Sequence, residues 1–489
     1  MDELMAQRVA KVEALREAGV DPYPTRAARS HTSSEVVALV AALPEGANEC
    51  EGVTVDVAGR IVARRDMGKA TFIDLLDGEG RLQVLLRQNA LENYDGIKNT
   101  DLGDFVGFRG TPIRTRTGQP TVQAASWTML AKALHAPPEK YHGLADAEIR
   151  QRRRYLDLMA NEETRRVFTV RSRVIASMRR FLDARGFLEV ETPILQESES
   201  GAAARPFLTH FNAIDEQRVL RISLELHLKR LVIGGFERVY EIGRNFRNEG
   251  MSFKHNPEFT MMETYEAYAD YLKVAEMAEQ MVANAAREVL GTTKIAFRDH
   301  EIDLAPPWRR ITFNDALIEY AKLDLTAFPD AESLRAELRR RGVDAPATAG
   351  YGKLCDEAMS HYVEPNLIQP TFLLDYPVEL SPLAKRKPGN PRLVERFECF
   401  VAGFECGNAY TELNDPIEQR QRFEAQLDLK AAGDDEVELV DDDFLFALEH
   451  GMPPTGGFGM GIDRLVMLLT GQSSIREVIL FPPMKSLKE

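Results

Sequence analysis

The stretch that decides the fold runs from Tyr240 to Glu263 and reads YEIGRNFRNEGMSFKHNPEFTMME. Apolar ends flank a central run rich in Arg, Asn, Glu and Gly, and this pattern predicts a strand, a loop and a second strand. Arg247 can hold a phosphate through paired hydrogen bonds, His255 can add a charge or a donor, and Phe259 offers a face for a purine. A charged surface hairpin would explain any three of these residues, but the density of polar and aromatic side chains favours a nucleotide site.

A second candidate site lies near the C-terminus, where residues 456–465 read GGFGMGIDRL. The glycines permit close approach of the backbone at a strand-to-helix junction. Arg464 replaces the third glycine of a dinucleotide-binding fingerprint, and no β-α-β unit follows. Because the helix dipole disfavours a cation at a helix start, Arg464 suggests an anionic or stacked ligand. An exposed Arg in a glycine-rich turn is the alternative.

A pair of carboxylates marks a third region. Glu398 and Glu405 flank a turn at Gly403, so they can converge across a hairpin although their spacing is odd. Two carboxylates that face nucleotide phosphates would bind Mg²⁺, a hard cation that prefers oxygen ligands.

Polar side chains alternate in the strand that follows this turn. Asn408, Tyr410 and Glu412 share period-two parity, so they project from one face. An amide, an aromatic ring and a carboxylate suit a pocket for a cationic, partly apolar small molecule. A mixed polar sheet face is the alternative.

The N-terminal third predicts a separate small barrel. Its polar and apolar residues alternate in about five short strands with one inserted helix near 90–94, which suits a closed barrel of the oligonucleotide-binding type. We expect an α+β chain in which this barrel precedes an antiparallel catalytic sheet with flanking helices. The predicted parts are an N-terminal helical extension, the barrel, a linker and a catalytic domain with a helix-rich insertion, over residues 1–51, 52–135, 136–160, 161–489 and, for the insertion, near 298–369.

The amino-acid composition limits the possible classes of protein, but the net charge of the whole chain is a poor indicator of a nucleic-acid partner. The net charge of −15 disfavours a nucleic-acid partner, but 51–143 is nearly neutral and 148–185 is basic. No apolar run is long enough for a membrane span, and the acidic N-terminus does not resemble a secretory or transit signal. The four cysteines form no Cys-x-x-Cys pair, so we expect a reduced, cytoplasmic protein without a zinc site.

The motifs together resemble the class II aminoacyl-tRNA synthetases. Residues 186–193 and the preceding helix resemble motif 1, the dimer element; 246–249 (FRNE) resemble motif 2, and 459–464 (GMGIDR) resemble motif 3. The resemblance covers nearly the whole chain and is closest to the bacterial lysyl-tRNA synthetases, through RRRYLDL at 152–158 and NAYTELND at 408–415.

This resemblance implies a homodimeric enzyme that activates L-lysine with ATP and Mg²⁺ and transfers it to tRNA(Lys). The implied ATP-binding residues are Arg247, Glu249, His255, Phe259, Glu398, Glu405 and Arg464, among which Arg247 and Arg464 are catalytic and Glu398 and Glu405 bind Mg²⁺. The implied lysine-binding residues are Gly201, Glu225, Arg247, Glu263, Tyr265, Asn408, Tyr410 and Glu412. The implied anticodon-binding residues are Phe72 and Gln83, although the pattern alone also allows Phe72 in the barrel core.

Charge also argues for the substrate. A buried ammonium group must be paired, and Glu263 and Glu412 would pair it, whereas an aspartate-specific relative would need a cation. Three rivals are an aspartate or asparagine synthetase, a tRNA-independent ligase that lysylates a protein, and a non-catalytic tRNA-binding module. The carboxylates argue against the first rival, the barrel against the second, and the presence of Arg247, Glu249, Glu405 and Arg464 against the third.

Overall fold

The computed structural model describes residues 3–138, 146–198, 201–202, 204–431 and 440–486. Spatial proximity divides the chain into two compact units. One unit comprises Met1–Ala145 and Tyr155–Ala160, and the other comprises Asp146–Arg154 and Asn161–Glu489. We call them the barrel unit and the sheet unit.

The barrel unit is a closed five-stranded barrel, as predicted. Its strands follow the order β1-β2-β3-β5-β4, in which only β3 and β5 pair in parallel. Apolar side chains on the inner face of each strand form its core, which α2 also joins through Val36. The elements of this unit are α1 (Glu3–Glu17), α2 (Ser33–Ala41), β1 (Val55–Met67), β2 (Ala70–Leu76), β3 (Arg81–Arg87), η1 (Tyr94–Asn99), β4 (Phe105–Arg114) and β5 (Pro120–Ala131).

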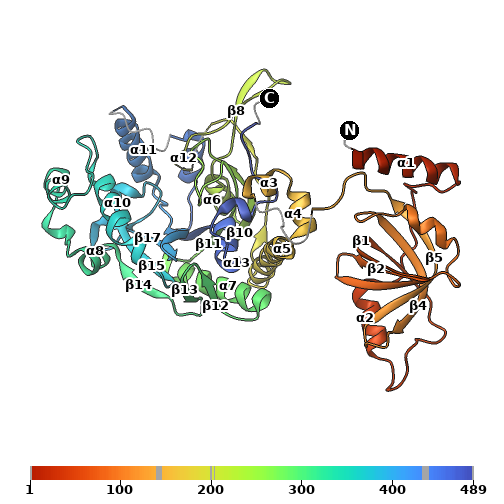
Figure 1. Cartoon of the computed structure of the whole chain (residues 1–489). Helices are drawn as coiled ribbons and strands as arrows, with labels where there is room; N and C mark the ends of the chain where they lie inside the picture. Colours follow the sequence, from red (N-terminus) through yellow and green to blue (C-terminus); the bar gives the residue numbers. More distant parts are fainter. Residues whose placement is uncertain (1–2, 139–145, 199–200, 203, 432–439, 487–489) are drawn as a thin grey trace. The chain divides into compact units, whose positions relative to one another are not determined.

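The sheet unit is built around one large sheet (Figure 1). Its strands follow the order β14-β15-β17-β18-β19-β11-β10-β6, and the predicted antiparallel character holds except at the two edges, where β14–β15 and β10–β6 are parallel. The strands are β6 (Leu188–Glu189), β10 (Arg238–Phe246), β11 (Glu258–Ala267), β14 (Arg309–Thr312), β15 (Thr371–Pro377), β16 (Arg386–Lys387), β17 (Asn390–Val401), β18 (Phe404–Thr411) and β19 (Thr455–Gly461).

Helices cover both faces of this sheet. On one face, α5 (Glu162–Asp183), α7 (Tyr271–Leu290) and α13 (Ile462–Thr470) pack against strand residues such as Met262 and Phe397. Side chains of successive strand residues alternate between faces, and Tyr265 accordingly belongs to another cluster, with α6 (Glu225–Ile233) and α12 (Asp442–Glu449).

The predicted insertion is helix-rich but begins with strands. α8 (Phe313–Ala321), α9 (Ala331–Arg340) and α10 (Tyr351–Tyr362) share a core with the β14 and β15 edge of the sheet. The hairpin of β12 (Lys294–Phe297) and β13 (His300–Asp303), together with β14, was not predicted, because strands of four residues show no alternation that stands out.

The expected linker over 136–160 lies partly outside the described residues, which omit 139–145. The described remainder contains two short helices, α3 (Ala147–Arg152) and α4 (Arg154–Ala160).

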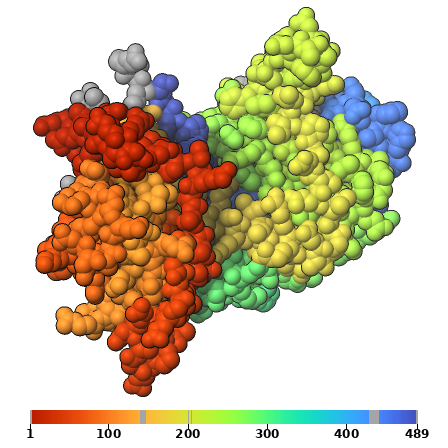
Figure 2. All heavy atoms as spheres, turned by 90° about the vertical axis from the view of Figure 1, so that its right-hand side faces the viewer, coloured from red at the N-terminus to blue at the C-terminus, as the bar shows by residue number. Residues whose placement is uncertain are grey.

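A small separate sheet completes the unit. It consists of β7 (Leu195–Gln196), β8 (Leu208–Phe211) and β9 (Glu216–Leu220), and the β8–β9 hairpin, yellow-green in Figures 1 and 2, projects from the rest of its unit. The remaining elements are α11 (Pro416–Ala431), η2 (Leu325–Ala327), η3 (Glu364–Asn366), η4 (Val378–Leu380) and η5 (Ile475–Glu477).

None of the helices in the described part of the chain has the length and apolar character needed to cross a membrane.

Candidate active site

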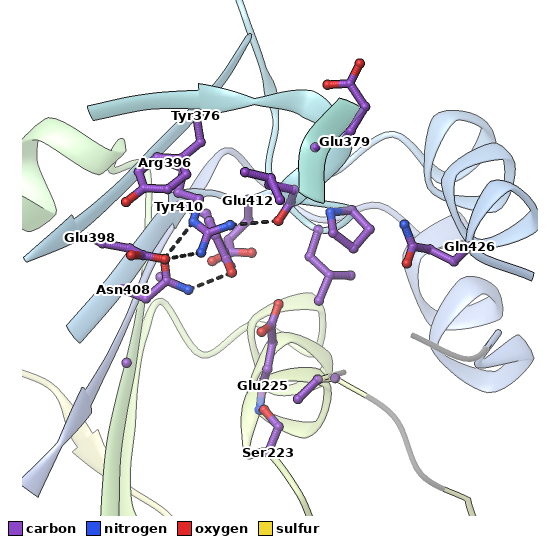
Figure 3. A pocket seen from close by; sticks show the side chains of 18 of the residues that line it. Ser223, Glu225, Tyr376, Glu379, Arg396, Glu398, Asn408, Tyr410, Glu412 and Gln426 are labelled. Carbon is purple, nitrogen blue, oxygen red and sulfur yellow. Dashed lines mark hydrogen bonds and ion pairs between the residues drawn. The ribbon is translucent and has the colours of Figure 1, made fainter. Parts of the chain in front are cut away.

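A cavity of about 510 Å³ opens on the large sheet (Figure 3). Its wall is formed by strands β11, β17, β18 and β19, by the start of α6 and by residues from the insertion. It gathers nine predicted site residues from separate parts of the sequence: Gly201, Glu225, Arg247, Glu263, Tyr265, Glu398, Asn408, Tyr410 and Glu412. The volume suits a small molecule.

Glu263 is a buried acid on β11, with a side chain held by neutral groups. Its Oε1 accepts hydrogen bonds from Ser223 Oγ (3.4 Å) and the Leu224 backbone N–H (3.3 Å), and its Oε2 accepts one from Tyr265 (3.1 Å). Burial and the nearby Glu225 carboxylate raise the pKa of Glu263 to about 7. A cationic ligand would stabilise its ionised form.

Glu412 lies just beyond the end of β18 and is 1% exposed. Its Oε2 lies 2.5 Å from Nζ of Lys229, which also contacts Oε1 of Glu225 at 2.5 Å. Burial raises the pKa of Glu412 to about 8, and the negative charges of Glu225 and Glu263 add to this rise. The ammonium group of Lys229 acts in the opposite direction but does not cancel it. Oε1 of Glu412 is buried and has no hydrogen-bond partner among the described residues.

Gly201 borders the same end of the cavity with a backbone φ of +81°. A Cβ atom there would approach Leu226 and Ser223 to 3.3–3.4 Å, so the glycine lets this loop lie close to the start of α6.

The neighbouring strand face carries a polar network, drawn in Figure 3. Arg396 on β17 donates to Asn408 Oδ1 (3.0 Å) and to Glu398, and Asn408 Nδ2 donates to the Tyr410 hydroxyl (2.6 Å). The expected common face of residues 408, 410 and 412 is confirmed, since all three line the cavity.

A second cluster surrounds Arg464, in the first turn of α13. Its guanidinium donates to the backbone O of Glu405 (2.7 Å), to Glu405 Oε2 (3.0 Å) and to His255 Nε2 (3.2 Å). Because a guanidinium only donates, Nε2 accepts, and the ring proton lies on Nδ1, 2.9 Å from Ser252 Oγ. Burial, reinforced by Arg464 and Lys254, lowers the pKa of His255 to about 4, so His255 is neutral at pH 7. In this arrangement the one N–H group of His255 faces Ser252, and the role of His255 at a nucleotide phosphate stays a prediction.

Arg247 connects the cavity with the second strand of the opening motif. Its guanidinium carbon lies 5.3 Å from the centroid of the Phe259 ring, and its Nε donates to Ile222 O (3.3 Å). Burial lowers the pKa of Arg247, but a guanidinium stays charged at any physiological pH. Glu249, two residues on, is exposed and accepts from the Arg205 backbone N–H (3.4 Å).

A β-bulge explains how Glu398 and Glu405 converge. Glu398 pairs with Asn408, but the register shifts after Cys399, so that Glu405 pairs with Phe400. Facing residues of antiparallel strands share a face, and this shift therefore turns Glu405 toward the side of Glu398 in spite of the odd spacing.

The electrostatics of these two carboxylates suit a hard cation. Burial and the nearby Glu405 raise the pKa of Glu398 to about 7, although Arg396 opposes them. Burial also raises the pKa of Glu405, but Arg464 and other cations outweigh it, and the net shift is downward. No cluster of three or more His, Cys, Asp or Glu residues suited to a metal occurs in the described part of the chain. Two carboxylates fit Mg²⁺, which takes few protein ligands and keeps phosphate and water oxygens.

The predicted anticodon residues share one outer face of the barrel unit. Phe72 on β2 is half-buried and lies outside the barrel core. Gln83 on β3 is 7% exposed, and its Oε1 accepts from Thr121 (3.0 Å). Phe72 pairs with Leu85, two residues from Gln83, so both side chains point to the same side.

Two residues with evident structural roles at the site were not singled out from the sequence. Lys229 is fully buried between Glu225 and Glu412, and Arg396 links Glu398 to Asn408. The only sequence signal for Lys229 is its spacing of four from Glu225, which is also typical of exposed helical ion pairs.

Comparison with known proteins agrees with this geometry. A family model described as class II tRNA synthetases (D, K and N) matches residues 146–485, and a model described as OB-fold nucleic acid binding domain matches residues 55–130. The chain therefore belongs to the class II tRNA synthetases.

Individual relatives narrow the group further. A lysine–tRNA ligase of Dehalococcoides mccartyi is 52% identical over 485 residues, which cover 99% of this chain and 97% of the relative. The lysine–tRNA ligases of Moorella thermoacetica (51% identical; 100% and 99% covered) and Bacillus subtilis (49% identical; 99% and 97% covered) are similar over the same extent.

Proposed function

We infer that the protein is a lysine–tRNA ligase, which activates L-lysine with ATP to lysyl-adenylate and transfers the lysyl group to the 3′ end of tRNA(Lys). The observation that carries this function is the acidic end of the cavity, where Glu263 and Glu412 are buried and Oε1 of Glu412 has no hydrogen-bond partner among the described residues. An ammonium group would satisfy that oxygen, whereas a carboxylate of aspartate would be repelled.

In this assignment, the two ends of the lysine substrate bind to different residues of the cavity. We assign the ε-ammonium of lysine to Glu263, Tyr265 and Glu412, and the α-ammonium to Glu225 and the Gly201 loop. Tyr410 lines the aliphatic chain, and Asn408 and Arg247 hold the carboxylate. These assignments are supported by the common cavity that these residues line.

In the first step, the lysine carboxylate attacks the α-phosphorus of ATP and pyrophosphate leaves. The nucleophile is already ionised, so no general base is needed, and catalysis consists of positioning and charge neutralisation. Arg247 would hold the α-phosphate, with adenine between Phe259 and Arg464, and Glu249 and His255 would contact the nucleotide. Mg²⁺, when bound by Glu398 and Glu405, would neutralise phosphate charge.

In the second step, the terminal ribose hydroxyl of tRNA attacks the carbonyl carbon of the adenylate, and AMP leaves. We assign this chemistry to residues 161–489 and recognition of the anticodon to the barrel at 52–135, with Phe72 as a stacking platform and Gln83 beside it. The preceding extension, 1–51, and the linker at 136–160 complete the proposed domains.

A homodimer in the cytoplasm is the proposed state of the enzyme. Large apolar side chains are exposed around the motif 1 strand and the small sheet that contains the projecting hairpin, as expected of a contact surface. They include Leu188 (47% exposed), Ile194 (43%), Leu195 (49%), Leu208 (65%) and Phe211 (43%). All four cysteines are free, which suits a reducing compartment. Light scattering that gives twice the mass of 55.0 kDa would support the dimer.

The test of function is ATP–pyrophosphate exchange screened over the twenty amino acids, with and without tRNA. Lysine alone should support exchange, and tRNA should not be needed. Exchange with another amino acid in place of lysine would overturn the substrate assignment.

The first specific prediction concerns Arg247. Replacement by Ala removes the cation that we place at the α-phosphate, and exchange should fall by at least about a thousandfold, since one preorganised donor is worth a factor of about 10²–10³ and Arg247 also orients the carboxylate. The melting temperature and the oligomeric mass should stay close to those of the parent. Near-normal exchange in this variant would exclude the phosphate role.

A further inference from the structure

Lys229 is an uncommon lysine because water cannot reach it. Its side chain is 0% exposed and projects from α6 into the protein interior. Burial alone would make an ammonium group deprotonate. Here burial lowers the pKa of Lys229, but Glu225 and Glu412 more than compensate, and the pKa lies above its ordinary value. Lys229 is therefore a buried cation at neutral pH, held between two carboxylates.

The contacts of this cation connect the two ends of the proposed lysine site. Nζ lies 2.5 Å from Oε1 of Glu225 and 2.5 Å from Oε2 of Glu412. Lys229 thus contacts one oxygen of each carboxylate, and Oε1 of Glu412, which has no hydrogen-bond partner among the described residues, is left for a ligand. In Figure 3, Glu225 extends from its helix toward the strand end that carries Tyr410 and Glu412.

The number of charged groups at this end of the cavity suggests a function for the ammonium group of Lys229. Glu225, Glu263 and Glu412 bring three carboxylates to this end of the cavity, and Lys229 neutralises one of them. The two charges that remain correspond to the α- and ε-ammonium groups of lysine. Without Lys229, three buried carboxylates would share two substrate cations, and one carboxylate would have to bind a proton.

We propose that Lys229 is a positioning residue for the amino-acid substrate: its buried ammonium fixes Glu225 and Glu412 in orientation and favours their ionised forms, so that each end of lysine meets a charged acceptor. This inference rests on the proposed function. Lys229 acts through the two glutamates and does not itself contact the substrate.

The test begins with Lys229→Met, which keeps the length of the side chain and removes its charge. In lysine-dependent exchange, the KM for lysine should rise at least tenfold, while the KM for ATP and the kcat at saturating lysine change less than threefold. Raising the pH from 7 to 9 should narrow the difference in KM for lysine between the variant and the parent measured at the same pH, because alkali ionises Glu412 without help. The charged and titratable groups that interact with Glu412 are Lys229, Glu225, Glu263 and Tyr265, and Arg247 acts on the neighbouring Glu263.

The barrel unit supplies a matched control. Lys132 is also 0% exposed and lies between two carboxylates, 2.5 Å from Asp101 and 2.8 Å from Asp104. Lys132→Met removes an equally buried cation from the other unit. It should lower thermal stability and leave the KM for lysine in exchange equal to that of the parent at every pH.

The exchange assay distinguishes failure of the proposed function from failure of the proposed role of Lys229. If the unmodified chain shows no exchange with lysine, the proposed function fails. If it exchanges normally and Lys229→Met has an unchanged KM for lysine, or a raised KM that alkali does not restore, only the inference about Lys229 fails. If Lys229→Met does not fold, Lys229→Gln keeps a donor and removes only the charge, and the same KM effect is expected. Failure of both variants to fold would assign Lys229 to stability instead.

Discussion

At the residue scale, the site depends on carboxylates that are buried before any substrate arrives. Burial raises the pKa of Glu263 to about 7 and that of Glu412 to about 8, so both carry protons for part of the time at neutral pH. Lysine needs them ionised, and its binding should therefore release protons. Affinity should rise with pH from 6 to 8, by up to about tenfold per pH unit for each titrating group.

The release can be measured by titration calorimetry of lysine alone at pH 7, in buffers of different ionisation enthalpy. Glu263→Gln lacks one of the two groups and should release fewer protons per lysine bound. The stability of the free protein should depend on pH in the opposite direction to its affinity for lysine. Carboxyl groups with raised pKa values stabilise the fold at acid pH, and this contribution is lost as the pH rises through about 7 and 8. A lysine affinity that is constant from pH 6 to 8 would contradict the assignment.

Single residues were predictable from the sequence where a motif fixes their neighbours. Arg247 and Arg464 stand in such motifs, and their charge and position already suggested an anionic ligand. Lys229 and Arg396 were not singled out, because a lysine or arginine in an amphipathic segment is exposed by default. Only the tertiary packing of α6 under the end of β18 buries Lys229. The assigned roles of these residues stay predictions.

At the element scale, β19 forms part of the cavity wall because it consists largely of glycine. A Cβ atom on Gly457 would lie 2.0 Å from Glu412 Oε1 and 2.6 Å from the Tyr265 ring. Gly457→Ala should therefore displace Glu412. Loss of one ion pair of about 3 kcal/mol corresponds to a fall of about a hundredfold in kcat/KM for lysine.

A neighbouring glycine gives the control for this prediction. At Gly459 the first atom met is the flexible end of Met261, at 3.1 Å. The fall in kcat/KM for lysine should therefore be at least about tenfold smaller in Gly459→Ala than in Gly457→Ala. Lysine-dependent exchange and melting temperature, measured side by side, distinguish a local displacement from a folding defect. Equal losses in the two variants would show that strand β19 as a whole, rather than the Glu412 contact, is sensitive.

Elements were predictable in proportion to their length and periodicity. The sequence indicated the helix before residue 186, the two strands within 240–263, the strand after Gly403 and the strand-to-helix junction at 456–465, which the structure shows as α5, β10 and β11, β18, and β19 with α13. The strand within the region that resembles motif 1 has only two residues, Leu188–Glu189, and β14 is defined by its pairing with β15, far along the chain. The bulge after Cys399, which brings Glu405 to the side of Glu398, has no signature in the sequence.

At the scale of the whole molecule, net charge is a poor guide to the partner. A chain of charge −15 belongs to a family that carries an OB-fold nucleic acid binding domain. The acidic excess lies in the sheet unit, where several carboxylates line the cavity, and the barrel stretch is almost neutral. Local charge, counted by domain, is the quantity that bears on nucleic-acid binding.

The division into two units makes the two reactions separable by mutation. Phe72 lies on the outer face of the barrel, where stacking on a base would contribute about 1–3 kcal/mol. Phe72→Ala should therefore raise the KM for tRNA in aminoacylation by about ten- to a hundredfold and leave lysine-dependent exchange, which needs no tRNA, unchanged. Phe105 on β4 is a matched control, since it is also partly exposed (38%) and lies under Arg60 at 4.2 Å. If Phe105→Ala weakened tRNA binding as much as Phe72→Ala, the effect would arise from the stability of the barrel and not from base stacking.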